Sequence, residues 1–391
     1  MSDARSSRPR HRRTVSPARI AVRRAGVALV AASVLAATAV TVTVLIGSKS
    51  HGAAGATSHT PKLPHVTTTT VATGAITMSF VGDTDLGNTP QLPANPWGYL
   101  NPVKAALKAQ IQFMNLEGTL TNGGSSKCGS SSTNCYAFRN PPVYAQVYRN
   151  DGFLVLNSAN NHSHDFGSEG VNETTTAIHH SGMVQAGLPG QIAIERVGTI
   201  KVAFVDFAPY FNTNNLLNFS TAQHLITLAK QRATLVVVYM HVGAEGSSAD
   251  HVTGREEYYV GEDRGNAKSF AHFAIDHGAN LVVASGPHTL RGMEFYRGRL
   301  IAYSLGDFAN YYNFANVGTL ALSGILRVTI SSTGKFVSAK FISLTLQGAG
   351  RPFIDNSGAA RKFVAQLSLQ DFGRNAARFA VSGAVTATPV P

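Results

Sequence analysis

Short apolar runs alternate with polar, helix-like stretches over the middle of this chain. Six runs are rich in valine, isoleucine, leucine and phenylalanine, and most of them end in glycine, asparagine, aspartate or histidine. They cover residues 76–87, 111–121, 153–167, 200–210, 234–246 and 280–292. Continuous apolar runs of this length, bounded by turn residues, predict strands of largely buried sheets.

Stretches with helical character lie between these predicted strands. They cover residues 101–110, 142–150, 168–182, 221–232 and 266–278. Two of them end at Gly182 and Gly278, and glycine is favoured just after the last helical residue. Strands that alternate with helices in this way predict an α/β protein.

The pattern changes toward the C-terminus. Residues 318–347 predict strands joined by a turn at SSTGK, which would add an antiparallel part to the sheet. Residues 358–373 predict a final helix, and residues 381–391 predict a frayed tail. We therefore expect one folded domain over residues 76–345, followed by a C-terminal helix and flexible tail over residues 346–391.

The formal net charge of +12 is concentrated at the N-terminus. The first 24 residues contain eight arginines and one aspartate, about +7, which leaves about +5 for the other 367 residues. The remainder has no dense basic stripe of the kind that binds phosphate backbones. We therefore expect a basic tail over residues 1–24 and no nucleic-acid partner.

Residues 25–47 carry no charge. At about 1.5 Å per residue they are long enough to cross a bilayer core of about 30 Å. Arginines before this stretch and a single lysine close after it place the N-terminus in the cytoplasm by the positive-inside rule. We expect a single-pass protein of the cell membrane, with its main domain extracytoplasmic. The alternative is a cleaved signal peptide, because small residues lie within the stretch.

Residues 48–75 are rich in threonine, serine and alanine, which predicts a flexible linker. The two cysteines of the chain, Cys128 and Cys135, follow in the expected domain. Because thiols oxidise outside the cytoplasm, we expect a disulfide bond between them. Residues 255–265 are polar and predict a solvated loop, with a segment that borders the site as the alternative.

Polar side chains gather where the predicted strands end, and sites in α/β folds form at the carboxyl ends of strands. The candidates at these ends are Asp83, Asp85, Asn115, Glu117, Asn160, Asn161, His162, Asp165, His241, Glu245, Ser285 and His288. Each of them alone also has a purely structural interpretation, as a cap, a turn residue or a packed histidine. Together they form a mixed oxygen and nitrogen ligand set that suits divalent Mn, Fe, Zn or Mg.

The order of these motifs resembles the capsule-synthesis protein CapA family. The matching motifs lie between about Ile76 and Asn313 and read FVGDTDLG, NLEGTLT, LNSANNHSHDFG, YMHVGAEG and ASGPHTLRGMEFYRGRLIAYSLGDF. The last motif is the most specific of them. The family is linked to poly-γ-glutamate capsule formation and has a calcineurin-like metallophosphoesterase fold. The resemblance therefore implies a four-layer α/β/β/α sandwich.

The resemblance also implies a metal centre of one or two divalent ions. Its ligands would be Asp83, Glu117, Asn161, His241 and His288. Asn161 would supply an amide oxygen, and Glu117 would either bind the metal or support a residue that does. His162, the neighbour of Asn161, would be the catalytic general acid for a leaving oxygen. Two metals about 3.5–4 Å apart can hold a phosphate and activate water between them.

Two further residues are candidates for contact with substrate. Asn160 adjoins the predicted ligand Asn161, and Arg291 follows His288 within the last motif. For Arg291, a structural ion pair is an equally open interpretation.

Three positions depart from the family's usual motifs. Val242 stands where tryptophan is common, Ser285 stands where many members have histidine, and Asp307 stands where asparagine is usual. The loss of an imidazole at Ser285 would weaken one metal site. It favours either a mononuclear centre or a domain that binds without hydrolysing.

These observations predict a membrane-anchored protein of poly-γ-glutamate capsule or surface-polymer formation. Its site would be a metal-dependent hydrolase of the phosphoesterase type, acting on an anionic polymer or a phosphoester. Its partners would be the cytoplasmic membrane and a capsule-synthesis membrane complex. One alternative is a hydrolase or transferase that acts on amide-linked polyglutamate, in which the metal polarises a carbonyl. The other is a non-catalytic polymer-binding or scaffold subunit of a capsule export complex.

Overall fold

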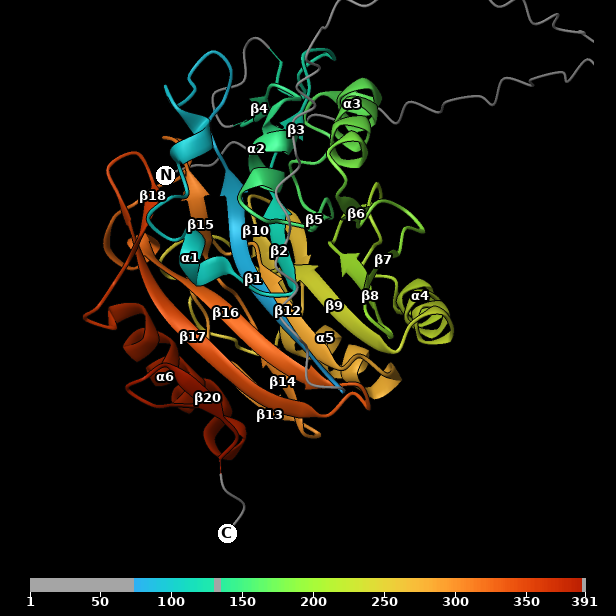
Figure 1. Ribbon diagram of the computed structural model, residues 1–391, viewed down its shortest axis with the longest axis vertical. Helices are drawn as coiled ribbons and strands as arrows, with labels where there is room; N and C mark the ends of the chain where they lie inside the picture. The colour runs from blue at the N-terminus through green and yellow to red at the C-terminus, as the bar shows by residue number, and fades with distance from the viewer. Residues whose placement is uncertain (1–73, 130–134, 389–391) are drawn as a thin grey trace, which may run out of the picture. The chain divides into compact units, whose positions relative to one another are not determined.

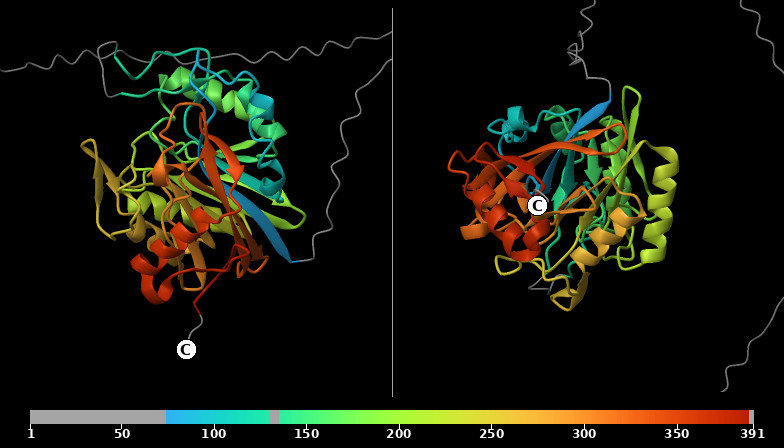
Figure 2. Two further views of the ribbon diagram at one scale, coloured as in Figure 1. Left: turned by 90° about the vertical axis from the view of Figure 1, so that its left-hand side faces the viewer. Right: turned by 90° about the horizontal axis from the view of Figure 1, so that it is seen from below.

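Two β-sheets lie face to face at the centre of this computed structural model, which describes residues 74–129 and 135–388 (Figure 1). Helices cover the outer faces of both sheets, so the layers follow the predicted order of helix, sheet, sheet and helix (Figure 2). None of the helices within these two ranges is long and apolar enough to cross a membrane. The predicted membrane segment, residues 25–47, lies outside the described residues.

The larger sheet has ten strands. They are β1 (Ala75–Asp85), β2 (Ile111–Leu116), β5 (Val155–Asn157), β6 (Val184–Ala186), β15 (Asp307–Asn310), β16 (Leu322–Ser331), β17 (Phe336–Gln347), β18 (Arg351–Ile354), β19 (Arg378–Phe379) and β20 (Ala384–Thr386). The main path runs β19-β20-β17-β16-β1-β2-β5-β6, with β15 paired to β1 and β18 paired to β17. Strand β1 is parallel to β2 and β15 and antiparallel to β16, so it joins the parallel and antiparallel parts.

The smaller sheet has six strands in the order β13-β14-β12-β9-β8-β7. Their bounds are β7 (Ala193–Val197), β8 (Ile200–Phe207), β9 (Leu235–His241), β12 (Leu281–Ser285), β13 (Met293–Tyr296) and β14 (Arg299–Ala302). Strands β8, β9, β12 and β14 are parallel. Two further pairs lie outside the sheets: β3 (Thr119–Leu120) with β4 (Arg139–Asn140), and β10 (Glu257–Tyr259) with β11 (Glu262–Gly265).

The helices pack on the sheets through their apolar faces. Helices α4 (Phe219–Arg232) and α5 (Ala267–His277) cover the smaller sheet, and α1 (Lys104–Leu107), α2 (Tyr144–Asn150) and α3 (Gly167–His180) cover the larger one. Helix α6 (Ala359–Phe372) packs against β13, β16 and β17. Short 3-10 turns occur at η1 (Pro96–Gly98), η2 (Gly318–Ala321) and η3 (Gly373–Asn375).

The core between the sheets is built from residues at alternate strand positions. Phe113 on β2 lies with its ring centroid 5.6 Å from that of Phe204 on β8 and 4.8 Å from that of Tyr239 on β9. Large aromatic side chains bury the most apolar area per residue, so contacts of this kind hold the two sheets together. They also fix the relative positions of the strand ends that carry the candidate site.

Local signals account for the ends of the helices. Asn218 and Asn266 precede α4 and α5, and each side chain accepts a hydrogen bond from a backbone N–H in the first turn. Gly278 has a φ of 117° and ends α5, as the sequence predicts. Each predicted helix overlaps a helix of the structure.

Strand β1 passes very close to the start of β15 at two glycines. A Cβ atom added to Gly82 would lie 1.8 Å from the carbonyl oxygen of Gly306. The next residue, Asp83, donates its backbone N–H to that same carbonyl at 2.9 Å. The contact requires glycine at position 82, and it joins the first motif of the chain to the last.

Two expectations about the chain are corrected by the structure. Residues 384–386, expected in the frayed tail, form strand β20, which pairs with β17 and β19. The C-terminal region therefore belongs to the ten-stranded sheet and does not follow a domain that ends at residue 345. Residues 255–265, expected as a solvated loop, contain the β10–β11 hairpin.

Candidate metal centre

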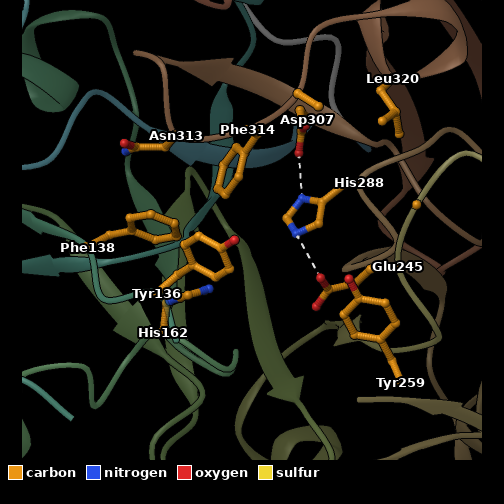
Figure 3. A pocket seen from close by; sticks show the side chains of 12 residues that line it. Tyr136, Phe138, His162, Glu245, Tyr259, His288, Asp307, Asn313, Phe314 and Leu320 are labelled. Atoms are coloured by element: carbon orange, nitrogen blue, oxygen red, sulfur yellow. Dashed lines mark hydrogen bonds and ion pairs between the residues drawn. The ribbon is translucent and has the colours of Figure 1, made fainter. Parts of the chain in front are cut away.

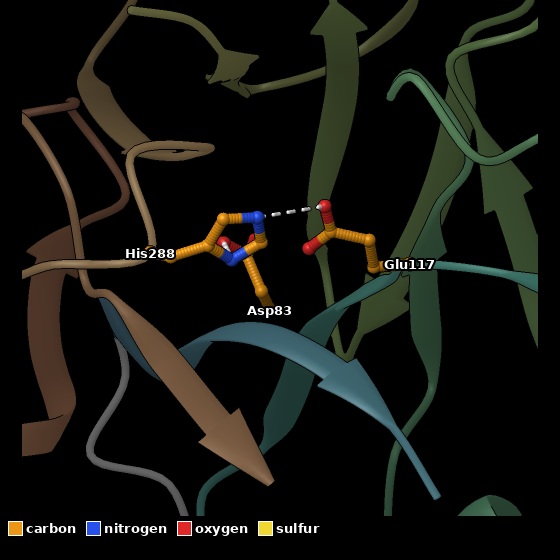
Figure 4. A group of neighbouring side chains, drawn as sticks. All are labelled: Asp83, Glu117 and His288. Carbon is orange, nitrogen blue, oxygen red and sulfur yellow. Dashed lines mark ion pairs between the residues drawn. The ribbon is translucent and has the colours of Figure 1, made fainter. Parts of the chain in front are cut away.

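The carboxyl ends of four strands meet at one edge of the two sheets. Asp83 lies near the end of β1, Glu117 directly follows β2, and His288 lies in the loop after β12 (Figure 4). His241 ends β9. His288 has a φ of 57°. A left-handed conformation costs a non-glycine residue about 1–2 kcal/mol, and such strain is concentrated at functional sites.

These side chains bring their ligand atoms within reach of one ion. Asp83, Glu117 and His288 each offer one ligand atom, and these atoms lie within 4.8 Å of one another. Both His241 Nε2 and His288 Nε2 lie 3.7 Å from Glu117 Oε1. Ligands at about 2.0–2.2 Å from a tetrahedral ion are roughly 3.3–3.6 Å apart, so the observed spacing needs little adjustment.

Several ligand atoms in this group are buried without a partner. Glu117 is fully buried, and neither of its carboxylate oxygens accepts a hydrogen bond from the described residues. Burial raises the pKa of Glu117, and the nearby charge of Asp83 raises it further. His241 Nε2 is also buried without a partner, and burial lowers the pKa of His241. A divalent cation would satisfy these atoms, so the donor set fits a metal.

His288 is oriented by Asp307, the residue that stands where the family commonly has asparagine. His288 Nδ1 lies 2.7 Å from Asp307 Oδ1, which leaves Nε2 for a ligand bond. Burial alone would lower the pKa of His288, but the carboxylates of Asp307 and Glu117 raise it above its ordinary value. Burial raises the pKa of Asp307 to about 6 against the opposing effect of His288.

Ser285 takes part in the site as a hydrogen-bond donor. Its hydroxyl donates to Asp83 Oδ1, which also accepts the side-chain N–H of Asn115 at 2.7 Å. The hydroxyl of Tyr239 donates to Ser285 in turn. Asp83 Oδ1 is thus already used by two donors, and Oδ2 is the oxygen nearer His288, at 3.4 Å from Nδ1. This arrangement favours one ion over two.

Asn160 shapes the loop after β5. Its side-chain amide donates to Asn115 Oδ1 at 2.9 Å and to the carbonyl of Leu116 at 2.8 Å, and its oxygen accepts the backbone N–H of His162 at 3.0 Å. The residue is 1% exposed. These contacts argue against the predicted role of Asn160 in substrate binding and give it a positioning role.

His162 forms a dyad with Asp165. His162 Nδ1 lies 2.8 Å from Asp165 Oδ2, which also accepts the backbone N–H of Phe138 at 2.6 Å. Lys127 Nζ lies 2.6 Å from the other oxygen of Asp165 and donates to the carbonyl of Asn161 at 2.9 Å. Because Asp165 acts as an acceptor, Nδ1 carries the hydrogen, and Nε2 is the nitrogen that remains for chemistry.

The protonation of His162 changes the predicted role of this residue. Burial lowers the pKa of His162, while Asp165 opposes the change. In the neutral form, Nε2 is a proton acceptor. The ring therefore begins as a base, and it can act as the predicted general acid after it has taken up a proton.

Asn161, the fifth predicted ligand, lies in the same loop. Its side-chain oxygen is buried without a hydrogen-bond partner within the described ranges, as are Glu117 Oε1 and Oε2. No hydrogen bond joins it to the four ligands above.

Arg291 is placed away from any substrate. It is 0% exposed, and its guanidinium donates to both carboxylate oxygens of Glu257, at 3.0 Å and 2.6 Å, and to the carbonyl of Ala249 at 2.7 Å. These contacts correct the predicted substrate role in favour of the structural ion pair.

Aromatic side chains that the sequence did not single out border the site. Phe138 packs on His162 with ring centroids 4.4 Å apart, and Phe314 packs on His288 at 4.6 Å (Figure 3). Phe314 lies six residues after Phe308, where the last motif ends. Phe138 follows the disulfide between Cys128 and Cys135, which is confirmed. The positions of Phe314 shortly after the last motif and of Phe138 shortly after the cysteine loop are the sequence signals that could have indicated these two residues.

The region that contains the motifs is also the region that resembles known proteins. Residues 77–312 match the family described as "Bacterial capsule synthesis protein PGA_cap". The PGA biosynthesis protein CapA of Bacillus subtilis is 31% identical over 180 residues, which cover 42% of this chain and 44% of that protein. The capsule biosynthesis protein CapA of Bacillus anthracis is 28% identical over 177 residues, or 40% of each chain. The matched region thus spans less than half the length of these two relatives.

More distant likenesses extend over more of the chain. A probable polyglutamine synthesis accessory protein of Mycobacterium tuberculosis is 25% identical over 269 residues, covering 64% of this chain and 69% of that protein. Among solved structures, a putative 5'-nucleotidase from Staphylococcus aureus is 14% identical with a TM-score of 0.40, over 74% of this chain and 58% of that chain. The family match covers more than half of the 391 residues and includes Asp83, Glu117, His241 and His288. The chain therefore belongs to the bacterial capsule synthesis protein family.

Proposed function

We propose that this protein is a metal-dependent hydrolase of the phosphoesterase type that serves the formation of a capsule or surface polymer. The observation that carries the proposal is the buried, unpartnered carboxylate of Glu117 between two imidazoles, beside a pocket that His162 lines. A purely structural cluster would leave this carboxylate at a high cost in desolvation. The names of the Bacillus relatives support the link to capsule formation.

The metal would be held by Asp83, Glu117, His241 and His288, with the buried, unpartnered amide oxygen of Asn161 as a further candidate. Such an ion, when bound, supplies a Lewis acid and lowers the pKa of a bound water. His162 would then move the proton, because its Nε2 is an acceptor while Asp165 holds Nδ1. Lys127 Nζ forms an ion pair with the other oxygen of Asp165, at 2.6 Å.

We also propose that residues 25–47 anchor the protein in the cell membrane, with the described domain outside the cytoplasm. The uncharged length of this segment and the basic residues before it support the proposal. The disulfide between Cys128 and Cys135 fits an oxidising compartment. Its partners would be the membrane and a capsule-synthesis complex.

A non-catalytic polymer-binding or scaffold role is the second candidate. The hydrogen bonds from Ser285 and Asn115 to Asp83 Oδ1 favour it, because they occupy an oxygen that a second ion would need. A centre with weak metal affinity would leave binding as the remaining activity.

The proposal is tested with the full-length protein and three alanine variants. Bound metal is measured by elemental analysis, and turnover is measured with p-nitrophenyl phosphate. His162→Ala should keep its metal and lose about 10²–10⁴-fold in rate, since general acid–base catalysis contributes this much. His241→Ala should lose metal and activity together. His179→Ala, an exposed histidine on α3, is the matched control and should change neither.

Absence of metal from the wild-type protein after incubation with Zn or Mn would refute the proposed hydrolase. Equal, mild effects of His162→Ala and His241→Ala would refute the assigned roles. Either result would favour the binding role.

A further inference from the structure

The pocket beside the metal ligands is small. It encloses about 300 Å³ and is bordered by His162 and His288 (Figure 3). This volume is at the lower limit of about 300–1,000 Å³ that is typical of small-molecule sites. It suits a single small ring next to the metal ligands, and it is too small for a folded length of polymer.

The charge of the pocket disfavours an anionic polymer. Two carboxylates, Glu245 and Asp307, line it, and no lysine or arginine does so among the residues that the structure describes. The basic side chains nearby are already paired: Lys127 with Asp165, Arg264 with Glu245 and Glu262, and Arg291 with Glu257. A row of carboxylates, as in polyglutamate, would meet like charges here. The pocket can therefore bind one anionic group, at the proposed metal centre.

One wall of the pocket is aromatic. Phe138 and Phe314 cover the two histidines and meet each other edge to face, with ring centroids 5.5 Å apart. Tyr136 stands at the mouth with 65% of its surface exposed. Tyr259 lines the pocket near Glu245 (Figure 3). Aromatic faces open to a pocket bind flat or ring-shaped groups by stacking.

Several polar groups that line the pocket can accept hydrogen bonds. Glu245 Oε1 accepts a hydrogen bond from Arg264 at 2.8 Å, so Glu245 Oε2 is the carboxylate oxygen that remains. The amide nitrogen of Asn313 donates to Asp85 Oδ2 at 2.5 Å, so its oxygen is the atom that remains. Carboxylate and amide oxygens accept hydrogen bonds from hydroxyl groups. An aromatic wall with acceptors opposite it matches a ring that carries hydroxyls.

We propose that the substrate of this site is a sugar phosphate, with its phosphate at the metal centre and its sugar ring against Phe314 and Phe138. This inference rests on the proposed hydrolase function and names its substrate class. In the reaction, water adds its oxygen to phosphorus, and the bond from phosphorus to the sugar oxygen breaks. The water yields a proton to His162, which passes it to the departing sugar oxygen.

Calorimetric titration of the full-length, zinc-loaded His162→Ala protein tests the inference by binding alone, because this protein should keep its metal and turn the ligands over too slowly to disturb the measurement. The ligands are inorganic phosphate, glucose 1-phosphate and tetra-γ-glutamate. Glucose 1-phosphate should bind about tenfold tighter than inorganic phosphate, because the C–H face of its sugar ring is removed from water against Phe314. Tetra-γ-glutamate should bind no tighter than inorganic phosphate.

Three variants identify the wall. Phe314→Ala should bring the ratio of the two affinities close to one with zinc content unchanged, and Phe314→Tyr should restore it. Phe211→Ala, with a side chain that is 91% exposed outside the pocket, is the matched control and should keep the wild-type ratio. An unchanged ratio in Phe314→Ala would overturn the inference, as would tighter binding of tetra-γ-glutamate.

The outcome separates this inference from the proposed hydrolase. Tight, Phe314-dependent binding of glucose 1-phosphate without any release of phosphate would refute the hydrolase and uphold the sugar site. Release of phosphate from p-nitrophenyl phosphate without a preference for the sugar phosphate would refute the sugar site and uphold the hydrolase.

Discussion

Glu117 should make the metal-free protein less stable and the metal-bound protein more stable. Its carboxylate is 0% exposed, has no hydrogen-bond partner among the described residues, and lies near the charge of Asp83. A buried group of this kind costs about 1–3 kcal/mol. Glu117→Gln removes the charge and keeps the shape. We therefore expect the variant to raise the free energy of unfolding of the metal-free protein by about 1–3 kcal/mol.

The increase in the free energy of unfolding of Glu117→Gln over the wild type should depend on pH. Because burial raises the pKa of Glu117, the folded protein retains a proton that the unfolded chain releases above its own pKa of about 4.3. The contribution of protonated Glu117 to the free energy of unfolding is fully present below about pH 4.3. It falls by about 1.4 kcal/mol per pH unit as the pH rises toward the pKa of Glu117 in the folded protein. The advantage of Glu117→Gln should therefore grow with pH in this window.

Metal should narrow the difference in stability between the two proteins, and it should reverse their order wherever the metal-free gain is below about 2.3 kcal/mol. At a free metal concentration of 100 times the dissociation constant, binding stabilises the wild type by about 2.7 kcal/mol. If the loss of this ligand weakens binding about 100-fold, the variant gains only about 0.4 kcal/mol at the same concentration. A purely structural carboxylate would give no such difference.

The assay is urea unfolding of both proteins with a chelator and with excess Zn or Mn. Glu256→Gln, an exposed glutamate, is the control and should follow the wild type under both conditions. A metal-free Glu117→Gln protein that is less stable than the wild type would contradict the reasoning. Equal stabilisation of both proteins by metal would also contradict it.

Three other substitutions test parts of the fold. Asp206 on β8 is buried with both carboxylate oxygens unpartnered in the described chain, and burial raises its pKa. Asp206→Asn should raise the free energy of unfolding by about 1–3 kcal/mol at pH 7 and change it little near pH 4. The reason is that the folded protein holds a proton that the unfolded chain releases only above its own pKa of about 3.9. Arg291→Met leaves Glu257 without its guanidinium and should lower the free energy of unfolding by about 3 kcal/mol. Urea titration measures both changes. Replacing Cys128 and Cys135 by serine should cost about 2 kcal/mol, and dithiothreitol should lower the melting temperature of the wild type but leave that variant unchanged.

The sequence predicts the alternating strands and helices because their signals are local. Apolar runs of continuous character mark β8, β9 and β12, and asparagine caps and a C-terminal glycine mark the ends of α4 and α5. Strand β20 carries no such signal, because it has three residues and depends on its pairing with β17. The β10–β11 hairpin is similarly set by pairing within a polar segment.

The convergence of the candidate ligands was predictable for a different reason. Parallel strands place their carboxyl ends at one edge, so polar residues after β1, β2, β9 and β12 meet regardless of their distance in sequence. The direction of a side chain after the strand is not fixed by this rule. Arg291 and Asn160 both lie in motifs, but neither side chain is free to contact a substrate. Arg291 bonds to Glu257, and Asn160 bonds to Asn115. Phe138 and Lys127 reach the site from a segment with no motif.

The contact between Gly82 and Gly306 sets the order in which the site can be assembled. Strand β1 forms early in synthesis, but its ligand-bearing end gains its parallel neighbour only when residues 306 to 310 have been made. Contacts between residues so far apart in sequence form late and slowly in folding. A growing chain therefore carries Asp83 and Glu117 long before His288 can join them. At the proposed metal centre, an ion would therefore enter a nearly finished fold, and the metal supply at the place where folding ends would decide its identity.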